Sequence, residues 1–306
     1  MTDMPRSNRR TDDGPIGRGK RALHWARRQY IRKARRRKAL LAMQGLPKPV
    51  QLAAQWAVMH TPSDAESMLI SSLEEVRAEI ASSDGSELHS YSSPVPGSFE
   101  LDGKGKASPG PRSAAPRKAH AGTGARPSKG VMLRRLVDGT EAARVLELGT
   151  NTGMSASYLA SSSHCETLVT VEGSASLAEV ARSVTSRYSA RIDVRCMMFD
   201  EALDALGQEA PFDLAFLDGQ HEGDALLHYT QRLTALVRHG GVIVFDDIYW
   251  SRDMNATWRS LVDDGPFDAT VDLGELGVGM LRGTPSGHHD FARFIGRPRI
   301  PPRVGD

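Results

Sequence analysis

From residue 130 onward, the chain alternates short apolar runs with longer segments of helical pattern. Five of these runs have the length of buried strands and are each followed by a helical segment: residues 145–148, 168–171, 192–196, 214–217 and 242–245. Two further strand-like runs, 269–273 and 278–281, close the series. This order predicts an α/β fold, in which a doubly wound and mostly parallel sheet of seven strands ends in a C-terminal β-hairpin.

The segments before residue 130 differ from this domain in composition. Residues 1–40 hold 14 Arg and Lys but three acids, a net charge of +11, although the whole chain has a net charge of only +2. In residues 90–129, 19 of the 40 are Gly, Pro or Ser, and such a stretch buries too little apolar surface to offset its ordering entropy. We divide the chain into five parts: a basic, partly disordered or helical arm (1–48), a helical segment (49–85), a disordered Gly/Pro/Ser-rich linker (86–129), the α/β domain (130–283) and a tail (284–306).

Two helices are expected before the linker. The first spans residues 21–43, which favour helix and lack Gly and Pro, and the prolines at 47 and 49 are expected to end it. The second begins after Ser63, because Ser63 and Glu66 have the spacing of a capping box. Its apolar side chains recur at helical spacing from Leu69 to Ile80, and it should end near Gly85.

Several classes of protein are excluded by composition. Only two cysteines are present, Cys165 and Cys196, too few for a disulfide scaffold or a cysteine-rich zinc module. No window approaches the roughly 20 apolar residues of a membrane span, and no signal peptide is recognisable. We therefore expect a cytoplasmic protein without a transmembrane segment.

Ligands of doubly wound sheets bind at the carboxyl ends of the strands, so the residues that follow each strand are the candidate site. After the first strand comes a turn from Gly149 to Gly153, whose backbone a ligand can approach closely. The second strand ends at Glu172, a position suited to bind two ribose hydroxyls. Taken singly, the turn also fits an ordinary strand–helix connection, and the acid a helix cap. Together they favour a nucleoside site.

The third strand leads to Phe199 and Asp200. A carboxylate here can accept a hydrogen bond from an adenine amino group while the aromatic ring packs on the base. Equally, Asp200 can cap the short helix that follows, since a carboxylate there satisfies free backbone N–H groups.

Three carboxylates follow the fourth and fifth strands: Asp218, Asp246 and Asp247. Unpaired, they would repel one another, and a divalent cation with oxygen ligands such as Mg²⁺ would relieve that repulsion. Alternatively, one Asp caps a helix, one binds the cofactor, and no metal is present. His221, three residues beyond Asp218, is the candidate general base, since histidine titrates near neutrality; the alternative is an exposed loop histidine.

At this point the residues resemble the class I S-adenosylmethionine-dependent methyltransferases, which have a Rossmann-like fold. The resemblance covers roughly residues 130–283 and rests on four stretches: "VLELGTNTGMSASYLA", "LVTVEGS", "FDLAFLDGQHEGD" and "GGVIVFDDIYWS". A bacterial subgroup with an "LELG" turn and a "DDIxWS" strand end is most similar. The arrangement also resembles the cation-dependent O-methyltransferases that act on catechol-like substrates.

The resemblance implies roles for individual residues. Glu172 would bind the ribose, Asp200 the adenine together with Phe199, and Asp218 would sit at the reacting end. The methionine part of the cofactor would lie against the glycine turn, made of Glu147, Gly149, Thr150, Asn151 and Gly153.

Two residues depart from the cation-dependent family. Asp247 stands where that family has Asn, and His221 stands where it often has a Lys base. We therefore expect S-adenosylmethionine as cofactor, with Mg²⁺ or another divalent cation on Asp218, Asp246 and Asp247 as a further expectation.

The expected function is methyl transfer to the hydroxyl of a small molecule. Two alternatives remain: an RNA methyltransferase that grips its substrate with the basic arm, and a non-catalytic protein that binds an anionic surface through residues 1–40. An acidic domain argues against phosphate binding near the site, since residues 130–283 hold 12 Arg and Lys against 23 Asp and Glu. A nicotinamide dehydrogenase is disfavoured because the turn lacks a third glycine.

Overall fold

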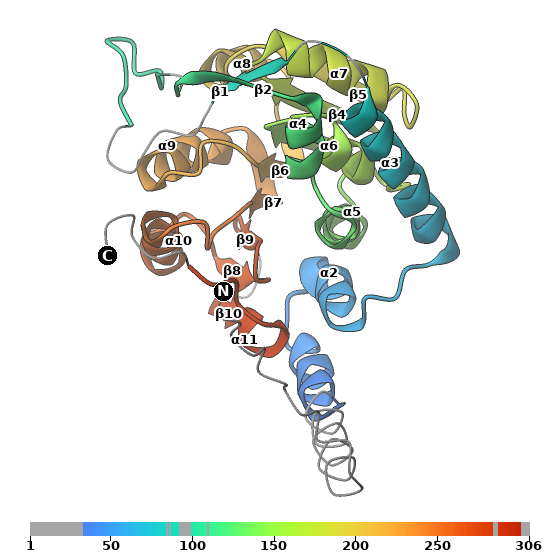
Figure 1. Ribbon diagram of the computed structural model, residues 1–306. Helices are drawn as coiled ribbons and strands as arrows, with labels where there is room; N and C mark the ends of the chain where they lie inside the picture. Colours follow the sequence, from blue (N-terminus) through green and yellow to red (C-terminus); the bar gives the residue numbers. More distant parts are fainter. Residues whose placement is uncertain are drawn as a thin grey trace, which may run out of the picture.

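The central sheet of the computed structural model runs through the whole molecule, with helices on both of its faces (Figure 1). The structure describes residues 33–83, 85, 87–91, 99–108, 110–283 and 287–300. Its sheet has the strand order β10-β8-β9-β7-β6-β3-β4-β5. Five parallel strands form one part of it: β3 (Arg144–Leu148), β4 (Thr167–Glu172), β5 (Ile192–Cys196), β6 (Phe212–Leu217) and β7 (Val237–Phe245).

A β-hairpin completes the predicted seven strands. In it, β9 (Gly277–Met280) lies antiparallel between β7 and β8 (Ala269–Asp272). The predicted fold class is confirmed. An eighth strand, β10 (Gly287–Asp290), pairs parallel with β8 at the edge of the sheet. Sequence periodicity did not indicate β10, because its four residues Gly-His-His-Asp include no large apolar side chain.

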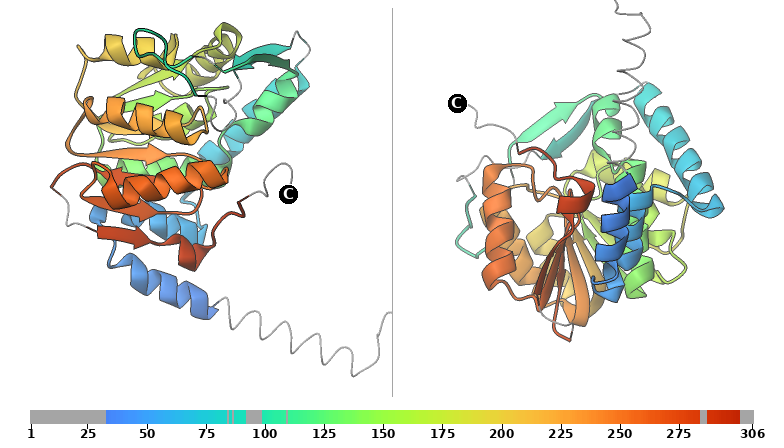
Figure 2. Two further views of the ribbon diagram at one scale, coloured as in Figure 1. Left: turned by 90° about the vertical axis from the view of Figure 1, so that its left-hand side faces the viewer. Right: turned by 90° about the horizontal axis from the view of Figure 1, so that it is seen from below.

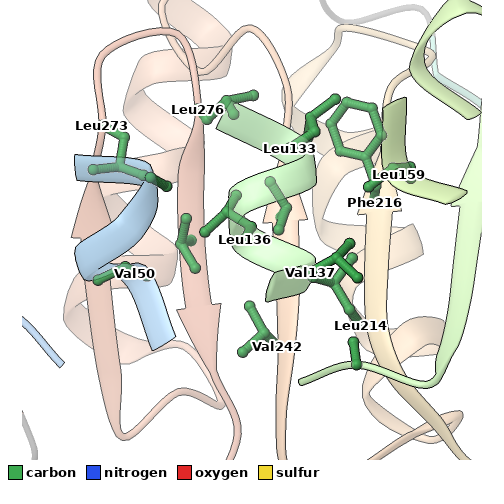
Figure 3. Packing of buried hydrophobic residues seen from close by; sticks show 14 of the residues in the cluster. Val50, Leu133, Leu136, Val137, Leu159, Leu214, Phe216, Val242, Leu273 and Leu276 are labelled. Carbon is green, nitrogen blue, oxygen red and sulfur yellow. The ribbon is translucent and has the colours of Figure 1, made fainter. Parts of the chain in front are cut away.

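Alternate side chains of the central strands enter two different cores, as expected for a sheet covered on both faces. On β6, for example, Leu214 and Phe216 join one core, whereas Ala215 and Leu217 join the other. The first core packs against α2 (Lys48–Met59), α5 (Pro127–Thr140) and α6 (Met154–Ala160), and Figure 3 shows Leu136 of α5 between Val50 of α2 and Leu214 of β6 in this core. The second packs against α8 (Phe199–Leu206), α9 (Gly223–Thr234) and α10 (Arg252–Asp264).

The order of the strands reverses between β3 and β6. From β3 the chain first builds outward to β4 and β5, and then returns to the other side of β3 to place β6 and β7. The loops that follow β3 and β6 therefore diverge at the carboxyl ends of these strands. The crevice between them is where sheets of this kind bind ligands.

The helices before the sheet follow the capping signals of the sequence. α3 spans Asp64–Ser82, and its capping box is complete, because the Ser63 side chain accepts from the Glu66 N–H and Glu66 accepts from the Ser63 N–H. Residues 33–43 are helical, as expected; residues 1–32, which include the start of the first predicted helix and most of the basic arm, lie outside the described residues. The same two prolines also mark the start of the next helix: Pro47 is the N-cap residue of α2, and Pro49 lies in its first turn.

Much of the predicted disordered linker is ordered, so that expectation is wrong for the residues described. β1 (Leu88–Tyr91) and β2 (Arg112–Ala115) form a two-stranded ribbon, followed by α4 (Arg117–Thr123). Figure 2 shows this ribbon apart from the central sheet. Order comes from contacts that composition does not reveal: the Ser176 hydroxyl accepts from the His89 N–H at 2.9 Å.

The remaining helices are α7 (Ala175–Thr185) and the short α11 (Ala292–Ile295), which follows β10. Across the part of the chain that the structure describes, no helix combines the length and the apolar character needed to cross a membrane.

Candidate functional site

A cavity of about 590 Å³ opens at the carboxyl ends of the central strands. Its walls come from the turn after β3 and from the residues that follow β4, β6 and β7. β1 and the start of α5 also contribute, so the segment before residue 130 is part of the site. A cavity of this size suits a small molecule or cofactor.

The turn after β3 brings the backbone into direct contact with the end of β6. Gly149 has φ +104°, and a Cβ built on it would lie 1.7 Å from the carbonyl oxygen of Asp218. Only glycine fits this position. The amides of Gly149 and Thr150 donate to the Val171 carbonyl, at 3.0 and 3.3 Å. These bonds tie the turn to β4 as well.

Glu172 lies beside this turn and lines the cavity. One carboxylate oxygen accepts from the Asn151 N–H at 2.8 Å and the other from the Ser174 N–H at 2.9 Å. Burial raises the pKa of Glu172, although both backbone hydrogen bonds favour its charged form. Asn151, where a middle glycine is often found, takes φ +50°, a conformation that asparagine tolerates.

Three residues of the predicted cofactor turn lie under the cavity floor instead of lining it. Glu147 is fully buried and accepts from the Thr170 hydroxyl at 2.5 Å, and that hydroxyl lies 2.5 Å from Thr150 Oγ1. Burial raises the pKa of Glu147 to about 7. Gly153 has φ +84° and starts α6; a Cβ there would lie 2.9 Å from Thr185 of α7. These residues support the turn from below.

Phe199 and Asp200 both line the cavity. Asp200 does not cap α8, because the N-cap residue of α8 is Met198 and Asp200 lies within the first turn of the helix. Its carboxylate instead accepts from Arg232 Nη1 at 2.6 Å, lies 2.8 Å from His228 Nε2, and accepts from the Ala107 N–H at 2.7 Å. The residues around Ala107 are thereby fastened to the domain.

The three carboxylates that follow β6 and β7 do come together. Asp218 is 24% exposed, towards the cavity, whereas the Asp246 side chain is 1% exposed. Burial raises the pKa of Asp218 to about 6. Burial, and next the charge of Asp218, raise the pKa of Asp246. His221 joins them, with Nε2 3.7 Å from Asp218 Oδ1 and 4.0 Å from Asp247 Oδ2.

Lys129 completes this group, and sequence reasoning missed it. Its ammonium lies 2.6 Å from Asp246 Oδ2 and 3.9 Å from Asp247 Oδ1. Burial alone would lower the pKa of Lys129, but Asp246, Asp218 and Asp247 outweigh burial and raise it, so the ammonium stays charged. Lys129 was assigned to the linker. The start of α5 at Pro127 was the available signal, because proline is common in the first turn of helices.

This lysine changes how the carboxylates fit a divalent cation. Three neighbouring carboxylates are a suitable donor set for Mg²⁺. However, an ammonium lies against two of the three. Among the residues described, no group of three or more His, Cys, Asp or Glu side chains has an arrangement that could hold a metal ion. The carboxylates gather as expected, but their arrangement suits the lysine.

Comparison with known proteins places the central part of the chain in a family. Residues 146–248 match the family described as "Methyltransferase domain". A segment of 123 residues is 37% identical to the catechol O-methyltransferase of Mycobacterium tuberculosis; it covers 39% of this chain and 54% of that protein. The chain thus spans about half the length of this relative.

Solved structures give a weaker likeness. An O-methyltransferase from Bacillus cereus in complex with SAH has a TM-score of 0.46 at 20% identity, covering 74% of this chain and 95% of that one. The O-methyltransferase TomG from Streptomyces achromogenes has a TM-score of 0.44 at 23% identity, covering 52% and 82%. Both TM-scores are below 0.5, so the description of the fold depends on the strand order of the chain itself and not on these structures.

The family match begins inside β3 and ends just beyond β7, so it includes the turn, Glu172 and all three carboxylates of the site. Residues 146–248 therefore belong to a methyltransferase domain of the class I, S-adenosylmethionine-dependent type, similar to the cation-dependent O-methyltransferases.

Proposed function

We propose that this protein transfers the methyl group of S-adenosylmethionine to a hydroxyl oxygen of a small molecule. One observation carries the proposal: a single cavity is lined both by Asn151 and Glu172, which follow β3 and end β4, and by Asp218 and His221, which follow β6. The first pair suits a nucleoside and the second an acceptor hydroxyl. Identity to a catechol O-methyltransferase supports a hydroxyl as the acceptor.

At the nucleoside end, Glu172 binds the ribose. Both of its oxygens already accept a backbone N–H, which fixes the carboxylate, and each oxygen keeps a lone pair for a hydroxyl. The methionine part of the cofactor lies along the turn at Gly149. Arg232, His228 and the Ala107 amide hold the Asp200 carboxylate in place. This carboxylate accepts a hydrogen bond from the adenine in addition to these contacts.

At the acceptor end, the oxygen attacks the methyl carbon of the sulfonium, and the carbon–sulfur bond breaks. The products are the methyl ether and S-adenosylhomocysteine, and His221 takes the hydroxyl proton. Asp218 and Asp247 lie close enough to stabilise the imidazolium that forms. Since the sulfonium carbon is already electrophilic, the protein mainly positions the two reactants. Trp250, 57% exposed and 5.6 Å from the His221 ring between centroids, offers a flat surface for an aromatic acceptor.

Calorimetric titration with S-adenosylhomocysteine tests the nucleoside assignment. Glu172→Gln keeps the shape of the side chain but removes its charge, and hydrogen bonds to charged groups contribute about 1.5–3 kcal/mol, so Kd should rise roughly 10- to 100-fold. Glu201→Gln, on the exposed side of α8, is the matched control and should leave Kd unchanged. An unchanged Kd in Glu172→Gln would refute the assignment.

A turnover assay with catechol as the acceptor tests the role of His221. His221→Asn should lower turnover roughly 10²- to 10⁴-fold, the usual contribution of a general base, and leave the affinity for S-adenosylhomocysteine within about twofold. Full turnover in this variant would remove His221 from the proposal. The RNA and anionic-surface alternatives stay predictions, because most of the arm that motivates them lies outside the described residues.

A further inference from the structure

We propose that the ammonium of Lys129 is the permanent counter-ion of the acidic cluster formed by Asp218, Asp246 and Asp247, and that this cluster does not take a divalent cation. The statement about cation binding rests on the contacts of these four side chains. Its consequence, methyl transfer that needs no added metal, rests in addition on the proposed function.

The position of the ammonium is the first argument. Lys129 Nζ lies 2.6 Å from Asp246 Oδ2, on a carboxylate whose side chain is 1% exposed. A magnesium ion must approach its oxygen ligands to about 2.0–2.1 Å in a near-octahedral arrangement. A cation bound to the same oxygen from the cavity side would therefore lie against the ammonium. Asp247 Oδ1, at 3.9 Å, lies within ion-pair distance of the same ammonium but accepts no hydrogen bond from it.

The backbone around Lys129 is the second argument, because it prevents the lysine from being withdrawn easily. On one side, the Ser128 carbonyl accepts from Trp56 Nε1 of α2 at 2.7 Å. On the other, Gly130 packs so tightly on the Tyr158 ring that a Cβ would lie 2.2 Å from it. The start of α5 is thus fixed, and with it the Cα of Lys129. Only side-chain rotation could move the ammonium away.

Electrostatics is the third argument. Lys129 lies in the first turn of α5, where the helix dipole disfavours a positive charge. Its side chain is also only 15% exposed. Both effects oppose a charged lysine here, so the acids of the cluster must stabilise it. Three carboxylates and one ammonium carry a formal charge of −2, whereas the carboxylates alone would carry −3 and attract a divalent cation more strongly.

This arrangement explains the departure of the chain from the cation-dependent enzymes that it resembles. Where those enzymes often have a lysine three residues beyond the first Asp, this chain has His221. In this chain Lys129 instead reaches the acidic cluster from α5 and is held there as a charged donor beside Asp246, so His221, not Lys129, is the proposed proton acceptor.

Cation binding tests the proposal without cofactor or acceptor, so a failure of the proposed function would not obscure the result. The full chain is titrated with MnCl₂ alone, followed by electron paramagnetic resonance of free Mn²⁺, and with MgCl₂ by calorimetry. The unmodified protein should show no saturable site at millimolar concentrations. Lys129→Met should bind Mn²⁺ at least tenfold more tightly, and adding Asp246→Asn to it should remove that site. Lys129→Arg keeps the charge, and the exposed Lys118→Met of α4 is the matched control; neither should gain a site.

Two results would overturn the proposal. One is saturable binding of a single Mn²⁺ by the unmodified chain that Asp246→Asn abolishes. The other is a Lys129→Met variant that binds Mn²⁺ no better than the unmodified chain, since Lys129 would then not be what keeps cations out. If Lys129→Met does not fold, as judged by circular dichroism, the titrations of the unmodified chain and of Asp246→Asn still decide the question.

Discussion

At Gly149 the chain passes so close to the end of β6 that a single methyl group cannot be added. Gly149→Ala would place a Cβ 1.7 Å from the Asp218 carbonyl and would strain a backbone at φ +104°. Because backbone atoms on both sides of the contact are fixed by the sheet, relief requires moving β3 from β6. We expect this substitution to lower the free energy of unfolding by about 3 kcal/mol or more, towards the upper end of single-residue effects.

Urea denaturation followed by circular dichroism measures this change. The control is Gly103→Ala, because a Cβ at Gly103 meets nothing within 4 Å; its effect should stay within about 0.5 kcal/mol. A Gly149→Ala protein as stable as the unmodified one would contradict the close approach of β3 and β6.

The residues that sequence could predict are those fixed by their place at a strand end. Glu172, Asp218 and Asp246 each follow a recognisable apolar run, and parallel strands bring such ends to one edge of a sheet. Lys129 could not be found in this way. It reaches the cluster across 117 residues of sequence, through a helix whose position depends on how α2 and α5 pack.

At the scale of elements, α3 shows how one side chain can serve both its own helix and its neighbour. Glu66 completes the capping box with Ser63, and it also accepts from Arg135 Nε of α5 at 2.8 Å. The hydrogen bond from Arg135 is the main reason that the pKa of Glu66 falls from 4.5 to about 2. Joining α3 to α5 in this way makes their packing dependent on the charge of one carboxylate.

The lowered pKa predicts the direction and range of a pH dependence. A group with a depressed pKa in the folded state contributes stability that is complete above its unfolded pKa of 4.5 and is lost as the pH falls towards 2. The full contribution is about 3 kcal/mol, of which roughly 1.4 kcal/mol should be lost by pH 3.5. Urea unfolding at pH 7 and pH 3.5 should therefore show a smaller decrease in Glu66→Gln than in the unmodified chain.

Glu75→Gln changes an exposed acid on the same helix and is the control for this experiment. Its pH dependence should match that of the unmodified chain. Identical slopes for Glu66→Gln and the unmodified chain would mean that the link between Glu66 and Arg135 contributes nothing to stability.

The linker shows where reading elements from composition fails. A Gly/Pro/Ser-rich stretch cannot build a core of its own, but it can be ordered by a core that already exists. Here Glu222 accepts from the Phe99 N–H at 3.1 Å, and Asp200 accepts from the Ala107 N–H at 2.7 Å. Such contacts join a loop to residues about a hundred positions away, and no local pattern encodes them.

At the scale of the whole molecule, the net charge of +2 combines a basic arm with an acidic domain. Part of that acidity is gathered around the cavity, where Glu172, Asp218, Asp246 and Asp247 are among the lining residues. A cationic sulfonium is therefore attracted to the site, and the neutral thioether left after transfer is held less strongly. The sheet that carries these acids was predictable because its hydrophobic periodicity repeats five times. The contributions of β1 and α4 to the cavity wall were not, because they come from a segment without such periodicity.

Ligand binding at this site should stabilise the whole domain, because the cavity joins the ends of β3, β4, β6 and β7. A ligand that binds only the folded state adds about 2.7 kcal/mol at a concentration of 100 Kd. For S-adenosylhomocysteine, this corresponds to a rise in Tm of roughly 5–10 °C if the domain of residues 130–283 unfolds as one unit. Differential scanning fluorimetry should show the rise, and Glu172→Gln should show much less of it at the same concentration. If Lys129 provides the positive charge of the cluster, neither chelator nor added Mg²⁺ should change the rise. A rise that appears only with Mg²⁺ would instead mean that the carboxylates hold a cation when the cofactor is bound, and that Lys129 gives way to it.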